Sequence, residues 1–225
     1  MERVFFVMAA YNEEDNIDNT VKRLQDASYK NIIVVDDGSK DNTSKIAEGT
    51  GVAVLRHVIN RGQGAALRTG IDYALLNGAN YIVTFDADGQ HRTEDLPAML
   101  EPVLKGEADI TLGSRFLKPT KMPFARKVLL KGSLLVQNLF YGIRMTDVHN
   151  GFRVLSRSAA KELDFKSDRM EHASEIVDLI HKKKLKFKEV PVVIKYSKDI
   201  IRHGQSSFFG AFNILFKMIL RKIKV

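Results

Sequence analysis

The sequence of 225 residues contains no cysteine. Disulfide scaffolds, cysteine-ligated zinc or iron–sulfur sites and thiol nucleophiles are therefore excluded. A metal ion in this protein has to bind to carboxylates, amides or histidines, and the six histidines show no metal-ligand spacing. We therefore expect carboxylate and amide oxygens to form any metal site.

Long apolar runs are also missing. No stretch reaches the roughly 18 uninterrupted apolar residues that a membrane-spanning helix needs. Residues 1–7 lead directly into a strand-like run, without the apolar stretch and cleavage site of a signal peptide. These absences predict a cytoplasmic protein that does not span a membrane.

Acidic residues are scarce near the C-terminus. Of the 35 lysines and arginines 12 lie between Lys182 and Val225, together with only two of the 27 acidic residues, so the surplus behind the net charge of +8 is C-terminal. Such a segment can be a solvated face, a nucleic-acid patch or a contact with anionic lipid head groups. Because aromatic residues are not interleaved with these cations, we expect no nucleic-acid partner.

The basic segment ends in a strongly apolar stretch, residues 208–224, which Asn213 and Lys217 interrupt. This pattern suits a helix that lies in a membrane interface. The alternative is a C-terminal helix packed on the domain. On the first interpretation the protein is peripheral on the inner face of the cell membrane.

Strand-like and helix-like segments alternate through the first 113 residues. Apolar and β-branched runs predict strands at 3–9, 31–36, 52–57, 81–86 and 108–113, and helical patterns fill 13–27, 41–49, 63–77 and 93–105. The alternation predicts an α/β fold with a mostly parallel central sheet flanked by helices. The less regular second half suggests helices near 126–143 and 171–183, a short strand within 147–155 and a strand near 187–194. We expect one domain over 1–196, followed by a basic loop and an amphipathic helix over 197–225.

Acidic residues follow two of the predicted strands, where α/β sheets bind their ligands. Asp86 and Asp88 can hold a divalent cation with Gln90 as a neutral ligand, and such a cation would turn a nucleotide diphosphate into a good leaving group. An acidic pair in this position can equally be a solvated turn. Asp36 and Asp37 are placed to accept hydrogen bonds from a base or ribose, although a helix N-cap near Ser39 would also explain them.

Six motifs in order over about residues 4–155 resemble the inverting family 2 glycosyltransferases. Within that family the chain resembles the dolichyl-phosphate-mannose synthase branch and its bacterial undecaprenyl-phosphate relatives. The motifs are Ala10-Tyr11-Asn12-Glu13, Val35-Asp36-Asp37-Gly38-Ser39-x-Asp41, Asn60-x-Gly62-x-Gly64-Ala65-x-x-x-x-Gly70, Asp86-Ala87-Asp88-Gly89-Gln90, Gly113-Ser114-Arg115 and Asp147-x-x-x-Gly151-Phe152-Arg153.

The resemblance implies a fold, a reaction and a cofactor. The fold is the GT-A (nucleotide-diphospho-sugar transferase) fold. The reaction is inverting transfer of a sugar from a nucleotide-diphosphate donor to a polyprenyl phosphate, undecaprenyl or dolichyl phosphate, at the cytoplasmic membrane face, for cell-surface glycan synthesis. The cofactor is a divalent metal, Mg or Mn. A UDP-sugar is favoured over a GDP-sugar, and a small membrane protein partner and a homo-oligomer are further expectations.

The resemblance also implies roles for individual residues. Asp86 and Asp88 would bind the metal of the diphosphate, with Gln90 as a further ligand. Arg115 and Arg153 would bind the acceptor phosphate or developing charge, because guanidinium matches phosphate through its planar fork. Arg202 lies in a basic loop that would close over the acceptor phosphate. Donor binding would involve Ala10, Tyr11, Glu13, Asp36, Asp37, Arg61, Gly64 and Ala87.

The acceptor decides what Asp147 does. A hydroxyl acceptor needs a general base, whereas a phosphate monoester is already an anion and needs only positioning. Asp147 would therefore deprotonate a hydroxyl of a glycan or protein, or else orient Arg153 or the donor sugar. A non-catalytic nucleotide- or nucleic-acid-binding module is the remaining alternative, and the acidic loops argue against it because they would repel a phosphate backbone.

Overall fold

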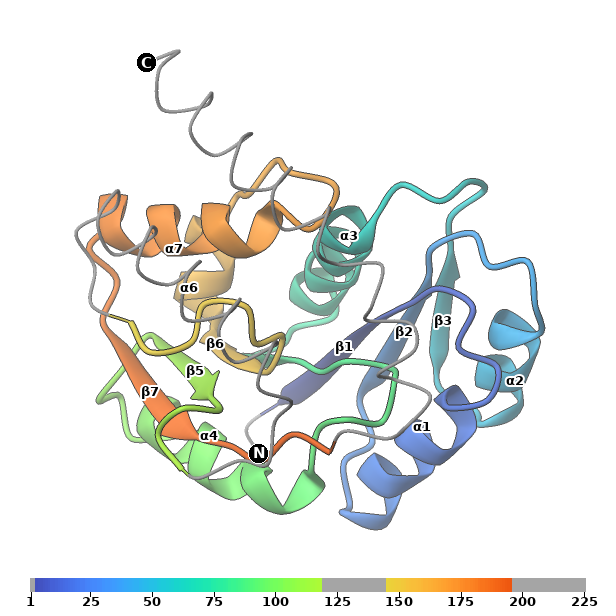
Figure 1. Ribbon diagram of the computed structural model, residues 1–225, viewed down its shortest axis with the longest axis horizontal. Helices are drawn as coiled ribbons and strands as arrows, with labels where there is room; N and C mark the ends of the chain where they lie inside the picture. The colour runs from blue at the N-terminus through green and yellow to red at the C-terminus, as the bar shows by residue number, and fades with distance from the viewer. Residues whose placement is uncertain (1–2, 119–144, 196–225) are drawn as a thin grey trace.

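The computed structural model describes residues 3–118 and 145–195 (Figure 1). The predicted helix near 126–143, Arg202 and the segment 197–225 lie outside the described residues. The described strands are β1 (Val4–Ala10), β2 (Ile32–Asp36), β3 (Ala53–Arg56), β4 (Tyr81–Thr84), β5 (Ile110–Ser114), β6 (Arg153–Ser156) and β7 (Phe187–Pro191). The described helices are α1 (Ile17–Asp26), α2 (Thr43–Gly49), α3 (Gln63–Leu76), α4 (Leu96–Leu104), α6 (Arg157–Glu162) and α7 (His172–Lys182), with the short helix η1 (Thr93–Asp95) before α4.

The described strands form one sheet in the order β3-β2-β1-β4-β6-β5-β7. β1 pairs in parallel with β2 and β4, β2 with β3, and β5 with β7, whereas β6 is antiparallel to both β4 and β5. The predicted α/β fold with a mostly parallel sheet is therefore confirmed. The antiparallel direction of β6 and the short helix α6 were not predicted.

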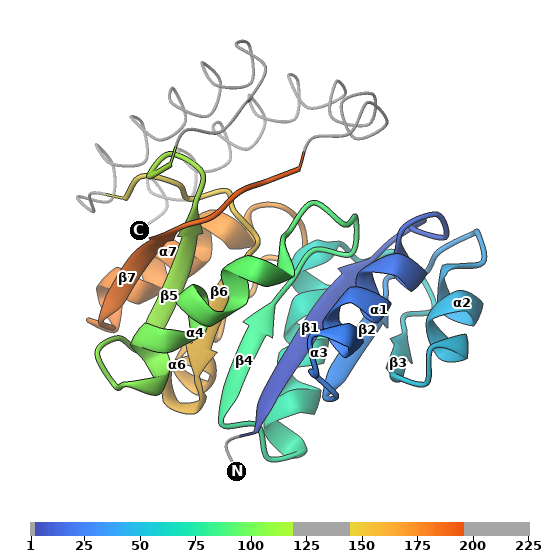
Figure 2. The same ribbon diagram turned by 90° about the horizontal axis from the view of Figure 1, so that it is seen from below.

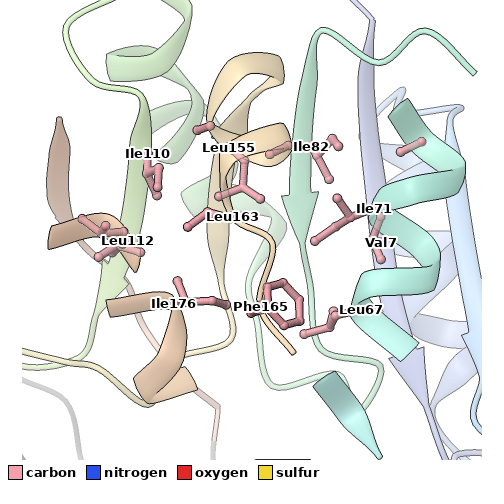
Figure 3. Close-up of a cluster of buried hydrophobic side chains, with 14 of the residues drawn as sticks. Val7, Leu67, Ile71, Ile82, Ile110, Leu112, Leu155, Leu163, Phe165 and Ile176 are labelled. Atoms are coloured by element: carbon pink, nitrogen blue, oxygen red, sulfur yellow. The ribbon is translucent and has the colours of Figure 1, made fainter. Parts of the chain in front are cut away.

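Two apolar clusters cover the two faces of the sheet. One combines strand residues with α3, α6 and α7, and the other combines strand residues with α1 and α4. Figure 2 shows α1 and α4 in front of the sheet and α3 and α7 behind it. In the close-up of the first cluster, Ile71 of α3 lies beside Val7 of β1, and Phe165 lies near Leu67 (Figure 3). Burial of such aliphatic and aromatic side chains stabilises the sheet that carries the polar loops.

The sheet topology brings the polar loops to one edge. The carboxyl ends of β1, β2, β3, β4 and β5 all meet there, and β6, which runs the opposite way, begins there with Arg153. The predicted strand 81–86 ends at Thr84, so Asp86 lies in the turn beyond the strand. The predicted helix 13–27 begins only at Ile17, because residues 13–16 form a turn in which Glu13 O accepts from the backbone N–H groups of Asn16 and Ile17. Among the described residues no helix is long and apolar enough to cross a membrane.

Candidate active site

The turn after β4 carries the two acids predicted to bind a metal, Asp86 and Asp88. The Asp88 carboxylate accepts a hydrogen bond from the backbone N–H of Gln90 (3.0 Å) and a second from the Gln90 side-chain amide. Helix α1 supports the turn from one side, because Thr20 Oγ1 donates to Ala87 O (3.1 Å) and Arg23 Nη2 donates to His91 O (2.9 Å). The turn is thus attached to a packed helix, which limits how far the two carboxylates can move.

His91 is a residue of this turn that the sequence did not reveal. Its ring is buried against Phe85 and Phe152, with centroids 5.1 Å from each, and its Nε2 donates to Asp86 Oδ2 (2.8 Å). His91 therefore orients the Asp86 carboxylate. Among the described residues it is not part of a cluster of three or more potential metal ligands. Its signal in the sequence was only its position, five residues after Asp86, and that spacing is uninformative without the fold.

Burial and neighbouring charges shift the pKa values of the two carboxylates in opposite directions. Burial alone would raise the pKa of Asp86, but His91, Arg153 and Arg115 together hold it below its ordinary value. Burial and the neighbouring Asp86 raise the pKa of Asp88, with the hydrogen bonds from Gln90 acting in the opposite direction. Two carboxylates that repel each other are the arrangement that a bound divalent cation would relieve.

The donor set fits a cation that is shared with a substrate. Within residues 3–118 and 145–195 no group of three or more carboxylates or histidines is arranged to hold a metal ion. Two carboxylates with substrate phosphates are nevertheless the usual way in which Mg²⁺ is bound at phosphate-transfer sites, since this ion keeps several non-protein ligands. Asp86, Asp88 and the Gln90 amide therefore match a metal–diphosphate complex better than an all-protein metal site.

Gly151 lets the segment before β6 approach Asp86. A Cβ at this glycine would lie 2.7 Å from Asp86 Oδ2 and 2.9 Å from Asp86 Cγ, and closer still to Oδ1. The backbone of the same residue is also held, because Thr84 Oγ1 donates to Gly151 O (2.6 Å). Any residue with a Cβ at position 151 would displace the Asp86 carboxylate, so glycine is required here.

Arg115 and Asp147 form a buried ion pair. Arg115 donates to the Asp147 carboxylate from Nε (2.6 Å), from Nη2 (2.7 Å) and from its backbone N–H (3.0 Å). Their side chains are only 6% and 2% exposed. Both oxygens of Asp147 therefore accept from Arg115, whereas the sequence suggested that Asp147 is a general base for a hydroxyl acceptor or else orients Arg153 or the donor sugar.

Arg153 lies at the start of β6, between the acidic turn and this ion pair. Its side chain is buried, and its Nη1 has no hydrogen-bond partner among the described residues. Burial lowers the pKa of Arg153, and the charges of Asp86 and Asp147 oppose that shift. Burial also lowers the pKa of the nearby His149 to about 4, so the positive charge of this part of the site comes from the arginines. A buried guanidinium with an unused donor is suited to an anionic ligand.

Asp36 and Asp37, expected at the nucleotide, are both buried at the end of β2. Asp37 accepts hydrogen bonds from the backbone N–H groups of Arg61 (3.0 Å) and Gly62 (2.6 Å), and its Oδ1 lies 2.6 Å from His57 Nδ1. Asp36 Oδ1 accepts from Ser39 N, and its Oδ2 lies 3.3 Å from Arg56 Nε. In this structure both carboxylates organise the loops that follow β2 and β3.

The other residues predicted for the donor lie on loops around the same edge. Ala10 is buried at the end of β1, while Tyr11 is 42% exposed and its side chain is accessible to a ligand. Glu13 Oε2 accepts from Asn16 Nδ2 (2.9 Å). Arg61 is half-exposed, with Nη2 3.7 Å from Asp168 Oδ2, and Gly64 lies against the backbone of Ser167 and the side chain of His172. The predicted site residues that lie within 3–118 and 145–195 are thus all found at the same edge of the sheet.

The described residues have the mostly parallel sheet and flanking helices of the GT-A glycosyltransferase fold. The model of "Glycosyl transferase family 2" matches residues 5–164, which is most of the chain. The chain belongs to this family, as its motifs indicated.

Two relatives and one solved structure illustrate the similarity. The UDP-N-acetylglucosamine–dolichyl-phosphate N-acetylglucosaminyltransferase of Methanococcus voltae is 34% identical over 98% of this chain and 96% of its own. The undecaprenyl-phosphate mannosyltransferase of Micrococcus luteus is 33% identical over 72% of this chain and 70% of its own. The glucosyl-3-phosphoglycerate synthase of Mycobacterium tuberculosis, solved with Mn²⁺, uridine diphosphate and phosphoglyceric acid, has a TM-score of 0.69 at 17% identity and covers 95% of this chain and 78% of its own. That likeness concerns the fold.

Proposed function

We propose that this protein is an inverting glycosyltransferase that moves a sugar from a nucleotide diphosphate, preferably a UDP-sugar, to a polyprenyl phosphate. The observation that carries the proposal is a pair of buried arginines, Arg115 and Arg153, next to the acidic turn of Asp86 and Asp88. A buried guanidinium with an unused donor, as in Arg153, suits a phosphate acceptor, and the acidic turn suits a metal-bound diphosphate. The relatives named for dolichyl- and undecaprenyl-phosphate transfer support this acceptor.

A divalent metal, Mg or Mn, would be held by Asp86 and Asp88 with Gln90 as a neutral ligand. When bound, it would neutralise charge on the departing nucleoside diphosphate. The protein's own contribution here is orientation: His91 fixes the Asp86 carboxylate, and the hydrogen bonds of Gln90 fix that of Asp88.

Arg115 and Arg153 would hold the acceptor phosphate opposite the donor. An oxygen of that phosphate then attacks the anomeric carbon while the bond from this carbon to the diphosphate oxygen breaks, and the configuration inverts. No proton has to be removed, because the attacking phosphate is already an anion at neutral pH. Asp147 fits this scheme as the carboxylate that orients Arg115, since both of its oxygens accept from that side chain.

The direct test compares polyprenyl phosphates with free polyprenols that lack only the phosphate. The full chain is incubated with radiolabelled UDP-sugars, Mn²⁺ or Mg²⁺, and either undecaprenyl phosphate, dolichyl phosphate or the corresponding free polyprenols. We expect label in lipid extracts from the phosphates alone. Transfer to the free polyprenol or to a glycan hydroxyl instead would favour the hydroxyl-acceptor function with Asp147 as base.

Variants sharpen this test. Asp88→Asn should abolish lipid labelling, and the matched Asp72→Asn on the exposed surface of α3 should leave it unchanged. Asp147→Asn does not separate the two acceptors, because it also removes the charge that orients Arg115. If Asp88→Asn retained full labelling with both metals, the metal–diphosphate assignment would be wrong.

The acceptor also implies where the protein works. A polyprenyl phosphate is confined to a bilayer, so we propose that the chain acts as a peripheral protein on the cytoplasmic face of the membrane. Its C-terminal basic and apolar segment, which lies outside the described residues, is the element that we expect to bind there. A membrane protein partner and a homo-oligomer stay predictions.

A further inference from the structure

Glu189 is a charged residue that neither the motifs nor the reaction accounts for. It lies in the middle of β7, and its carboxylate accepts hydrogen bonds from the loop that carries Asp147. Its Oε1 accepts from the backbone N–H of Thr146 (2.8 Å), from Thr146 Oγ1 (2.8 Å) and from the backbone N–H of Asp147 (3.1 Å). Its Oε2 lies 3.0 Å from the same Thr146 nitrogen. One carboxylate thus receives three donors from two consecutive residues.

These two consecutive residues are the ones that contact the segment after β5. Thr146 Oγ1 lies 2.6 Å from Ser114 Oγ, and Asp147 binds the side chain and backbone of Arg115. Glu189 therefore holds Thr146 and Asp147, the two residues that contact Ser114 and Arg115. In the sequence these segments are 32 positions apart, so nothing local holds them together.

The Glu189 carboxylate is attached to a strand that is paired within the sheet. β7 pairs with β5 from Phe187 to Pro191, with Glu189 opposite Leu112, and Val192 N donates to Ser114 O (3.0 Å) just beyond. Side chains mounted on sheet strands are placed more accurately than those on loops. Glu189 is thus suited to set the position of a loop residue that has to be placed accurately.

We propose that Glu189 is a positioning residue for the acceptor phosphate, acting through Asp147 on Arg115. Its carboxylate holds the backbone of Thr146 and Asp147, this fixes the Asp147 carboxylate, and Asp147 in turn aligns the Arg115 guanidinium. The inference rests on the proposed function, because it gives Arg115 the acceptor phosphate as its ligand. It adds a residue from a strand that carries no recognised motif.

The test is Glu189→Gln in the full chain, with separate measurements for donor and acceptor. The amide keeps the shape and can still offer one oxygen to these donors, but it removes the negative charge and places an N–H group beside Thr146 N, which already donates. We expect the KM for polyprenyl phosphate to rise about tenfold or more, with the metal-dependent affinity for UDP unchanged. The matched control is Glu107→Gln, which removes an exposed carboxylate that pairs with Lys188 at 2.6 Å and should change neither value. A loss shared equally by donor and acceptor would overturn the proposal, since a general structural role predicts that result.

A double-variant comparison tests whether Glu189 acts through Asp147. If it does, Glu189→Gln combined with Asp147→Asn should be no worse than Asp147→Asn alone, because the second change has already released Arg115. Independent effects that multiply in the double variant would contradict this route.

An NMR measurement makes the outcome independent of the reaction. The Arg115 Nε–H, assigned from its loss in Arg115→Lys, should give a sharp signal in the wild type because it donates to buried Asp147. Glu189→Gln should shift or broaden it, and Glu107→Gln should not. An unchanged signal refutes the positioning role even if the enzyme is active. Failure of the wild type to use any polyprenyl phosphate refutes the proposed function and leaves this measurement valid.

Discussion

Replacement of Gly151 by alanine should impair the metal–diphosphate site while leaving the fold intact. The new Cβ would lie 2.7 Å from Asp86 Oδ2, and ordinary contacts begin at 3.4 Å, so the carboxylate has to move by about 0.7 Å or more. It is the far end of a side chain and can move without repacking the core. Displacements near 1 Å at a reacting centre cost about 100-fold in rate. We expect a loss of this order in sugar transfer.

Two measurements check this prediction. Isothermal titration with UDP in the presence of Mn²⁺ should show weaker binding for Gly151→Ala, and binding without metal should change less. Thermal unfolding should stay close to that of the wild type. The matched control is Gly49→Ala at the end of α2, where an added Cβ meets nothing within 4 Å. That substitution should leave transfer unchanged.

Gly151→Ala would contradict this prediction if it bound metal and UDP as the wild type does and transferred sugar within about threefold of the wild-type rate. Unfolding of the variant would contradict it as well, because the structure would then leave no room for the Asp86 carboxylate to shift. In either case the close approach of Gly151 to Asp86 would not be what positions the acidic turn.

Two predictions concern stability. Gly70→Ala should destabilise the fold by about 1–3 kcal/mol in urea unfolding, with an unchanged KM for the donor, because its Cβ would lie 3.1 Å from Val35 Cγ2 and closer to Val7 Cγ1 in the core; unaltered stability would contradict the close helix–sheet packing. Burial lowers the pKa of His172 from 6.5 to about 4, so as the pH falls the unfolded chain is protonated at His172 before the folded chain. About 3 kcal/mol of unfolding free energy should therefore be present above pH 6.5 and be lost as the pH falls to about 4. In urea titrations at pH 7 and pH 4.5, His172→Gln should reduce this pH dependence, and an equal dependence in both proteins would show that His172 is protonated as easily in the folded state.

Most elements of the sheet could be predicted because they depend on local pattern. Buried parallel strands need continuous apolar residues, and Ile32–Val35 shows such a run. The prediction of the turns was wrong where a local pattern was misleading. Residues 13–16 continue a polar helical pattern, yet Glu13 N donates to Thr43 Oγ1 and the loops after β1 and β2 hold each other. Such contacts between distant loops leave no periodic trace in the sequence.

The direction of β6 illustrates the same limit. Four residues that read as a strand carry no sign of whether they run with or against their neighbours, and the pairing of Arg153 with both Thr84 and Leu112 is set by the fold. The consequence is functional, because the antiparallel direction brings the beginning of β6, and with it Arg153 and Gly151, to the edge where Asp86 lies.

The sequence by itself determined the family, the α/β class and the chemical types at the site, since acids and arginines in ordered motifs depend on residue identity alone. The tertiary structure decided which of those residues serve each other. Asp147 binds Arg115, His91 orients Asp86, Asp37 holds the loop at Arg61, and Glu189 organises the loop of Asp147. Hydrogen bonds act over about 3 Å in space, whereas their partners here are up to 43 positions apart in the chain, so only the folded backbone brings them within reach.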